Sequence, residues 1–291
     1  MPRIAYVDGR YLPHRRACVH IEDRGYQFAD GVYDVAAVIN RRPVDLEPHL
    51  ARLDRSLDQL AIRRPLGRRA LEVVVDQLIR RNRLRHGIIY IQATRGVAPR
   101  THDFPKIAVR PTLVATAKRL DLAGVLARQR RGVAVITAPD QRWARRDIKS
   151  VSLLANVIAK QTAAKAGAYE AWLVDGQGQV TEGTSSTSWI VTDGQVVTHP
   201  LGQTILAGIT RQVVGAITER ADVALVERPF TLDEARDARE AFLTSATNMV
   251  TPVVRLDDRP VGDGAPGPIT RDLIARHWAH VAAETGYRPP E

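Results

Sequence analysis

The chain has 291 residues, of which 44% are hydrophobic and 25% charged, and its formal net charge is +10. This length predicts one large or two ordinary domains, and the apolar content excludes a disordered chain. No apolar run approaches the ~20 residues that cross a bilayer, and the start MPRIAYVDG lacks the pattern of a secretory leader. We therefore expect a cytoplasmic protein with no membrane partner.

The excess of basic residues raises the question of a nucleic-acid partner. Arginines are spread from Arg3 to Arg288 among acidic residues, and no basic tail is present. Aromatic residues make up 5%, too few for a platform on which bases stack, and no nucleic-acid-binding motif occurs. The sequence therefore argues against nucleic acid and favours a solvated surface that attracts anionic ligands.

The first part of the chain alternates strand and helix patterns. Hairpins are predicted over residues 4–12, turning at Asp8–Gly9, and over 31–44, turning near Asn40. Leu50, Leu53, Leu57 and Leu60 recur at helical spacing and predict a helix after Pro48. A further helix is expected over 68–84, with a strand over 87–96 and another that begins at residue 112 and leads into a connector. We place the end of a smaller N-terminal α/β domain at residue 120.

Residues 121–291 are predicted to form a larger C-terminal domain. A connector leads to a strand over 133–139, and residues 150–167 are expected to form a helix that Gly167 ends. Strands over 171–174 and 188–191 follow, then a hairpin turn at Asp193–Gly194. Helices over 208–220 and 269–284 complete the pattern. The alternation indicates an α/β (α+β) fold.

Several chemistries are excluded because their motifs are missing. The sequence contains no G-x-S-x-G, no P-loop and no G-x-G-x-x-G. His102 and His199 have no partners at ligand spacing, and the single cysteine, Cys18, belongs to no zinc pattern. We therefore expect no metal and no internal disulfide.

Lys149 stands out because this chain uses arginine for almost all of its positive charge. Of the 42 basic residues only five are lysines: Lys106, Lys118, Lys149, Lys160 and Lys165. Arginine stays protonated, whereas a lysine beside cations such as Arg145 and Arg146 supplies a neutral, nucleophilic amine. The plainer interpretation of a single residue of this kind is a solvated lysine at the start of a helix.

Three features together meet the needs of pyridoxal 5'-phosphate (PLP), which takes an amine for its aldehyde, a carboxylate for its ring nitrogen and donors for its phosphate. Lys149 supplies the amine, Glu182 in VTEGTSS the carboxylate, and Gly208–Thr210 the start of a helix. Singly, Glu182 is more often a turn residue and such a threonine a helix cap. Their joint presence favours PLP.

Seven segments carry a resemblance along nearly the whole chain. In order they are EDRGYQFADGVYDV, HLARL, IYIQATRGVAPRTHDFP, RRDIKSVSLLANVIAKQ, VTEGTSSTSW, ILAGITR and FLTSATNMVTPV. With these segments the chain resembles the fold-type IV PLP-dependent aminotransferases, and within them most of all the bacterial D-amino-acid (D-alanine) transaminases. The resemblance implies a smaller N-terminal α/β domain, a larger C-terminal domain with a barrel-like sheet, and a homodimer.

Roles for individual residues follow from the resemblance alone. Lys149 is implied as the Schiff-base lysine and proton shuttle, with Glu182 at the pyridine nitrogen. Further cofactor contacts, several of them to the phosphate, are implied for Arg52, Leu206, Ile209, Thr210 and Thr247. Tyr33 is implied to lie over the site, and the substrate contacts are Tyr33, Tyr90, Arg100 and His102, of which Arg100 and His102 reach from the partner subunit.

The expected reaction is a ping-pong transamination from a D-amino acid such as D-alanine to a 2-oxo acid such as 2-oxoglutarate. Aminodeoxychorismate lyase and the branched-chain L-amino-acid and (R)-amine transaminases share the fold and remain alternatives, although the run Arg100–His102 favours the D-amino-acid branch. Two positions depart from the pattern of that branch. Thr187 occupies a position where the D-alanine enzymes commonly have asparagine. Ala246 occupies a position where they have a hydroxyl residue near the phosphate, and the neighbouring Ser245 or Thr247 is expected to supply that hydroxyl instead.

Overall fold

The computed structural model describes residues 3–221 and 223–290, and its contacts divide the chain into two compact units. The first unit contains the chain up to Asp121 together with the segment Ile148–Ser152. The second contains Leu122–Asp147 and the chain from Leu153 onward. The sequence assigned Lys149 to the C-terminal domain, whereas its segment packs with the first unit. No helix of the described residues is both long and apolar enough to span a membrane.

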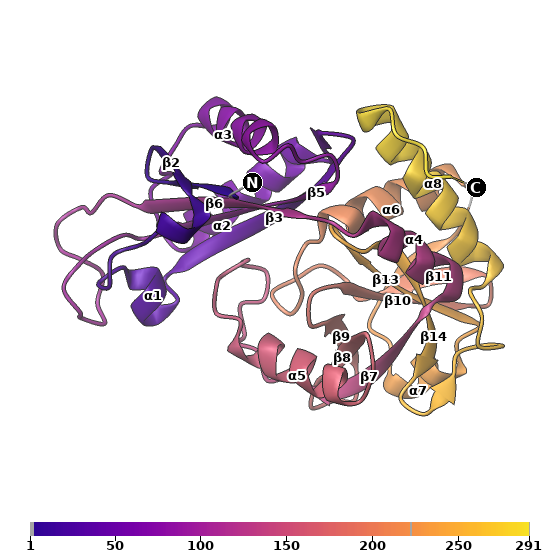
Figure 1. Ribbon diagram of the computed structural model, residues 1–291. Coiled ribbons are helices and arrows are strands. Elements are labelled where there is room, and N and C mark those ends of the chain that lie inside the picture. Colours follow the sequence, from indigo (N-terminus) through magenta and orange to yellow (C-terminus); the bar gives the residue numbers. More distant parts are fainter. Residues whose placement is uncertain (1–2, 222, 291) are drawn as a thin grey trace. The chain divides into compact units, whose positions relative to one another are not determined.

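The first unit is built on a six-stranded antiparallel sheet with the order β2-β1-β6-β5-β3-β4 (Figure 1). Both predicted hairpins are confirmed, and the residues at their turns, Asp8–Gly9 and Asn40–Arg41, have positive φ. The strands are β1 (Ile4–Val7), β2 (Arg10–Pro13), β3 (Gly31–Ile39), β4 (Arg42–Pro43), β5 (Gly87–Thr94) and β6 (Thr112–Arg119).

Two amphipathic helices, α2 (Leu46–Gln59) and α3 (Arg68–Arg81), contribute to one core with the sheet. The predicted leucines Leu50, Leu53 and Leu57 are buried there. Since strand residues alternate in direction, Tyr33 and Tyr90 lie on the opposite face from these helices. The sequence did not reveal two short elements, the 3-10 helix η1 (His14–Arg16) and the helix α1 (Arg24–Phe28).

The segment that carries Lys149 is extended and lies along the edge of β3. The backbone N–H of Tyr33 donates to the carbonyl of Lys149, and the N–H of Val151 donates to the carbonyl of Gly31, both over 3.0 Å. Val32 and Ser150 form a bridge between these bonds. The helix predicted from residue 150 therefore begins later, as α5 (Leu154–Lys165). Pairing with a strand more than a hundred residues away overrides the local helical pattern.

The second unit is built on a curled nine-stranded sheet with the path β12-β11-β10-β13-β14-β7-β8-β9, and β15 pairs with β14. The pairs β14–β7, β7–β8 and β11–β12 are parallel and the others antiparallel. This half-barrel confirms the barrel-like sheet expected from the sequence. The strands are β7 (Val133–Pro139), β8 (Glu170–Val174), β9 (Val180–Gly183), β10 (Thr187–Thr192), β11 (Gln195–Thr198), β12 (Leu225–Glu227), β13 (Glu240–Ser245), β14 (Met249–Leu256) and β15 (Arg259–Pro260).

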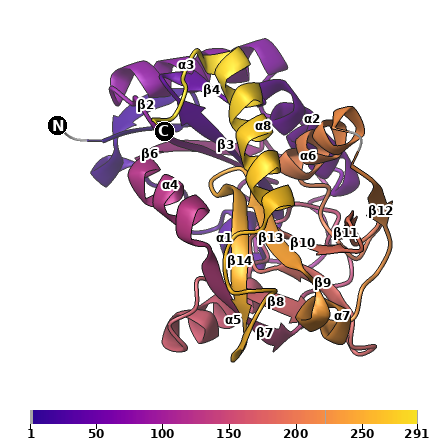
Figure 2. The ribbon, with the colours of Figure 1, turned by 90° about the vertical axis from the view of Figure 1, so that its right-hand side faces the viewer.

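Helices cover the curled sheet, and one core cluster around Trp172 and Phe230 packs against several of its strands. The predicted helices α6 (Ile209–Arg220) and α8 (Pro268–Thr285) pack on β13 and on each other, and α8 also lies across β14 (Figure 2). Helix α5 packs on β7 and β8. The connector predicted before residue 133 is a helix, α4 (Leu122–Arg131), and the short α7 (Leu232–Asp237) begins with a capping box.

Candidate active site

Lys149 is placed by its backbone, and its amine lies against an aromatic ring. Its N–H donates to the Oγ of Ser56 on α2 over 3.3 Å, in addition to the bond from Tyr33 to its carbonyl. The Nζ atom is 4.5 Å from the ring centroid of Tyr33. Among the described residues of the first unit, no carboxylate forms an ion pair with this half-buried amine. A fixed backbone and an amine without a carboxylate partner suit a lysine that forms a covalent bond.

Tyr33 and Tyr90 stack on the sheet face that α2 and α3 leave uncovered. Their ring centroids are 5.4 Å apart and their planes 25° from parallel. The Tyr90 hydroxyl donates to the Oε1 of Gln92 over 2.7 Å. Burial, and then the neighbouring Tyr33, raise the pKa of Tyr90 above its ordinary value. The Tyr90 hydroxyl is therefore protonated at neutral pH and serves as a hydrogen-bond donor rather than a base.

Arg52, for which the sequence predicted a phosphate contact, is held by a buried carboxylate that sequence reasoning missed. Its Nε and Nη2 donate to the two oxygens of Asp34 on β3, each over 2.8 Å, and the Nδ1 of His49 lies 2.7 Å from Asp34 Oδ1. Burial by itself raises the pKa of Asp34, but the charge of Arg52 and hydrogen bonds from His49 and Arg52 lower it well below the usual range. This bidentate contact fixes the plane of the guanidinium. The phosphate role of Arg52 stays a prediction.

Arg100 and His102 lie together on the loop between β5 and β6. Both side chains are exposed, and both contact the ring of Phe28 at the end of α1. The guanidinium carbon of Arg100 is 5.0 Å from the centre of that ring, and the ring centroids of His102 and Phe28 are 5.5 Å apart. The structure therefore brings together the two residues that the sequence predicted to bind a substrate carboxylate.

In the second unit, Glu182 is buried on β9 and accepts hydrogen bonds at both carboxylate oxygens. Oε1 accepts the backbone N–H of Leu206 over 2.9 Å, and Oε2 accepts Nη1 of Arg142 over 2.5 Å. The same guanidinium donates to Asp140 over 2.8 Å, and the Thr181 hydroxyl donates to Asp140 over 2.6 Å. These bonds fix the carboxylate of Glu182 in one plane, as expected of a group that faces a cofactor ring.

Arg142 and Asp140 are residues that sequence reasoning missed, because nothing in their local pattern separates Arg142 from its arginine neighbours. Burial by itself lowers the pKa of Arg142, but the hydrogen bond to Asp140 and the charges of Glu182 and Asp140 raise it above its ordinary value. The neighbours that the sequence placed beside Lys149 have carboxylate partners of their own. Arg145 pairs with Asp147 over 2.8 Å, and Arg146 lies 3.6 Å from Asp140.

The start of α6 matches the predicted phosphate-binding element. Gly208 is its N-cap residue, with extended backbone, and no side chain caps the helix. Ile209 and Thr210 in the first turn are buried. A Cβ on Gly208 would lie 3.0 Å from the hydroxyl of Thr187, so Thr187 packs directly against this turn. An uncapped helix start with a close backbone approach suits an anion.

Thr247 lies in the turn between β13 and β14. The hydroxyl of Ser245 in the same turn accepts the backbone N–H of Asn248 over 3.1 Å, so it has a structural partner. Of the two hydroxyls that the sequence offers in place of Ala246, Thr247 is thus the better candidate. Its contact with a phosphate stays a prediction.

The hydroxyl run after Glu182 serves a second buried carboxylate. Thr184, Ser185 and Ser186 all donate their hydroxyl groups to Glu170 on β8, with Ser185 at 2.9 Å and Ser186 at 3.3 Å. The amine of Lys160 on α5 lies 3.4 Å from Glu170 and also donates to the carbonyl of Tyr169. Lys160 is therefore a structural residue and not a neutral comparison for Lys149.

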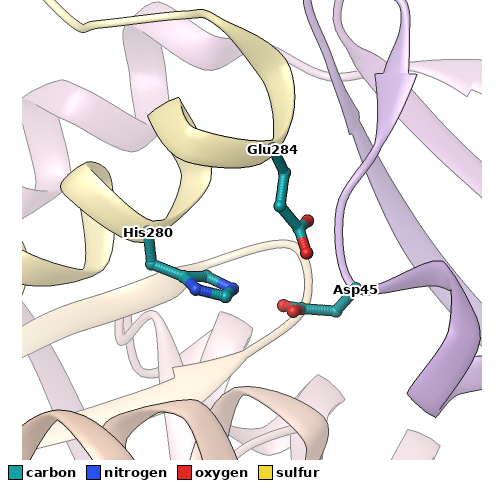
Figure 3. Close-up of side chains that lie close together, drawn as sticks. All are labelled: Asp45, His280 and Glu284. Carbon is teal, nitrogen blue, oxygen red and sulfur yellow. The ribbon is translucent and has the colours of Figure 1, made fainter.

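A possible metal cluster needs three or four protein ligands. Figure 3 shows His280 and Glu284, four residues apart along α8, and Asp45, which precedes α2. Asp45 belongs to the first unit, so the described residues of the second unit offer only His280 and Glu284 at this place. Two side chains on one helix do not define a metal site, and we assign none to them.

Taken separately, the two units contain three features of the kinds that PLP requires. A lysine amine without a carboxylate partner in its unit lies beside an aromatic ring, a buried carboxylate is fixed by a guanidinium and an amide, and an uncapped helix start offers donors. Residues 31–256 match the model of the amino-transferase class IV family, and the chain belongs to this family.

Proteins similar to this chain include two D-alanine aminotransferases. The chain is 40% identical over 270 residues to that of Staphylococcus haemolyticus, covering 92% of this chain and 94% of that protein. It is 39% identical over 278 residues to that of Bacillus licheniformis, covering 96% and 97%. A crystal structure of the T.th. branched-chain amino acid aminotransferase with pyridoxamine 5'-phosphate matches with a TM-score of 0.87 at 25% identity, over 99% of this chain and 96% of that one.

Proposed function

We propose that this chain is a PLP-dependent transaminase that moves the amino group of a D-amino acid such as D-alanine to a 2-oxo acid such as 2-oxoglutarate. The observation that carries the proposal is the 40% identity to D-alanine aminotransferase over 92% of the chain. Arg100 and His102, side by side on the ring of Phe28, support the D-amino-acid branch over the other enzymes of this fold.

When bound, PLP supplies an aldehyde that condenses with amines and a ring that accepts electrons. Lys149 is the residue that bonds to the cofactor, and its Nζ moves the proton of the substrate α-carbon. Glu182 keeps the ring nitrogen protonated, while Ile209 and Thr210 bind the phosphate together with Arg52. Leu206 supports the site through its N–H, which fixes Glu182.

The substrate carboxylate is bound by Arg100 and His102, whose donors lie on one exposed loop, and Tyr33 and Tyr90 supply an aromatic wall. The proposal includes a homodimer in which this loop serves the partner subunit. Large apolar side chains exposed in the same unit support such an interface: Ile21, Tyr26, Val97, Phe104 and Ile107. Large exposed apolar side chains of this kind are common at surfaces that a partner covers.

The decisive test is Lys149→Ala. We expect the purified variant to keep the melting temperature of the wild type but to lose transamination of D-alanine with 2-oxoglutarate by about 10³-fold or more, because both the covalent contact and the proton transfer disappear. Pyruvate formation and the visible absorption of bound PLP are the measurements.

Lys165→Ala is the matched control, because Lys165 is exposed in the last turn of α5. It should retain full activity. Near-normal turnover by Lys149→Ala would overturn the assignment of the lysine. A wild type that prefers L-leucine or L-valine to D-alanine would move the protein to the branched-chain group, and release of pyruvate from aminodeoxychorismate without an oxo acid would make it the lyase.

A further inference from the structure

The loop that carries Arg100 and His102 is held by a buried arginine on α1. The side chain of Arg24 is 3% exposed. Its Nη1 donates to the carbonyl of Thr101 over 2.7 Å and its Nη2 to the carbonyl of His102 over 3.4 Å. These two carbonyls follow one another along the loop and belong to the peptide groups on either side of His102. One guanidinium therefore fixes the backbone at His102, two residues after Arg100.

Phe28, at the other end of the same short helix, orients the side chains themselves. Its ring contacts Arg100 and His102 as described above, and the guanidinium carbon of Arg24 lies 4.9 Å from its centroid. A cation over an aromatic face is attracted by the electrons of the ring. Arg24 thus fixes the loop backbone, and Phe28 fixes the directions of the two side chains.

The position of Arg24 is itself determined by a shared carboxylate. Asp30 accepts Nε of Arg24 over 2.8 Å and Nε of Arg95 over 2.7 Å. Arg95 also donates to the carbonyls of Leu60 and Ala61 just after α2, and its guanidinium lies 3.6 Å from the ring centre of Phe104 on the same loop. Two buried arginines on one carboxylate therefore anchor an otherwise exposed loop to the body of the first unit.

We propose that Arg24 and Phe28 are positioning residues for recognition of the substrate carboxylate. They do not touch the substrate; they hold Arg100 and His102 in the arrangement that binds it. This inference rests on the proposed function and adds residues that act through Arg100 and His102. The arginine fork is essential, because a lysine carries one compact donor group and does not span two carbonyls in a fixed geometry.

The effect should appear in KM for substrates that carry a carboxylate and not in cofactor binding. We expect Arg24→Lys to raise KM for D-alanine about tenfold, equivalent to about 1.4 kcal/mol. Phe28→Leu, which keeps apolar volume but removes the ring, should raise KM about threefold, because an exposed cation–ring contact is weak. Phe28→Tyr keeps the ring and should restore the wild-type KM.

The experiment is a double-mutant cycle in the full-length holoenzyme. Arg24→Lys and Phe28→Leu are each made alone and together with Arg100→Leu, and kcat and KM for D-alanine, the Kd for PLP and the melting temperature are measured. If Arg24 and Phe28 act through Arg100 and His102, each change should have a smaller effect once Arg100 is gone, and the effect that remains is the part that acts through His102. Tyr11→Leu is the matched control, since Arg81 lies 4.4 Å over the Tyr11 ring in the same unit.

Each outcome decides the inference. An unchanged KM in both single variants overturns it, and so does a KM effect that persists fully in the Arg100→Leu background. A parallel loss of PLP affinity and melting temperature would show that Arg24 and Phe28 support only the fold. A wild type that does not transaminate D-alanine would overturn the proposed function, and with it this inference, before any variant is compared.

Discussion

Two buried glutamates on the paired strands β8 and β9 have opposite kinds of partners. Glu182 accepts a guanidinium and a backbone amide, and its guanidinium partner is shared with a further carboxylate, Asp140. Glu170 accepts three hydroxyls and the N–H of its neighbour Ala171, with a lysine amine near it. The carboxylate of Glu182 is therefore held by a charged, planar guanidinium, and that of Glu170 mainly by hydroxyl groups, which can rotate.

Under the proposed function, this difference distinguishes a carboxylate that contacts the cofactor, Glu182, from one that stabilises a turn, Glu170. The planar fork of Arg142 fixes the direction of Glu182, as a protonated pyridine nitrogen would require. The hydroxyls around Glu170 lie in the turn that follows β9, and the side-chain amide of Asn156 on α5 also donates to the carbonyl of Thr184 in that turn, over 2.8 Å. Glu170 thus organises the turn next to Glu182 without sharing its role.

The largest difference should come from Glu182→Gln. The substitution keeps the shape and the acceptor for Leu206 but removes the charge that stabilises a protonated ring nitrogen, so kcat for D-alanine should fall by about 10²-fold or more. KM should change little, since the contact with the ring nitrogen acts mainly in the transition state. The melting temperature should fall only through the weaker bond to Arg142, which keeps Asp140 as a charged partner. Steady-state kinetics and a thermal melt check this prediction, and an unchanged kcat would remove Glu182 from the site.

Glu170→Gln should have the opposite result. The amide removes the negative charge to which the three hydroxyls donate and near which Lys160 lies, so the free energy of unfolding should fall by about 2 kcal/mol. The kcat per folded molecule should stay near that of the wild type. Urea unfolding monitored by circular dichroism measures the loss. A large drop in kcat at wild-type stability would contradict the contrast between the two glutamates.

Lys160→Ala measures how much the lysine amine near Glu170 contributes to stability. The lysine side chain is 42% exposed, so its contribution should be about 1 kcal/mol or less. Lys165→Ala, at an exposed position later on the same helix, should leave the stability unchanged. If Lys160→Ala costs as much as Glu170→Gln, the hydroxyls contribute nothing and the pair alone holds the turn.

The smallest expected effect is on the pH dependence of stability, through Asp140. Burial by itself raises the pKa of Asp140, but hydrogen bonds and charge from Arg142, then Thr181 and Arg146, lower it below its ordinary value. A lowered pKa stabilises the fold above the ordinary carboxyl pKa of about 4 and loses that contribution as pH falls through the folded value. Asp140→Asn should therefore be less stable at pH 7 and lose less on acidification than the wild type.

Melting temperatures measured from pH 7 to pH 3 test this prediction. The comparison variant is Glu234→Gln, because the pKa of Glu234 is also lowered, chiefly by the backbone N–H of Thr231, but at a more exposed position. Its pH dependence should change less. Equal changes in the two variants would mean that burial of the Asp140 network adds nothing to the pH dependence of stability.

Local patterns were sufficient for most elements but not for the surroundings of the site residues. Leucine spacing predicted α2, and turn residues predicted the hairpins, because both signals lie within a few neighbouring residues. The extended state of Lys149 depends on β3, and the partner of Glu182 is Arg142, forty positions earlier. Such contacts are set by tertiary packing. Similarly, nothing in the sequence indicated a partner for the hydroxyl run after Glu182, and all three hydroxyls donate to Glu170, more than ten residues earlier.

The segment Ile148–Ser152 also has a consequence for the order in which the protein is made. It completes the edge of β3, yet the ribosome synthesises it after α4 and β7 of the second unit. A nascent chain that ends at Asp121 therefore lacks part of its own sheet, and the first unit reaches its full set of backbone bonds only after Ser152 has emerged. Multidomain chains usually fold domain by domain during synthesis. In this chain the first unit cannot be completed before part of the second has been made, because the segment that contains Lys149 is synthesised later.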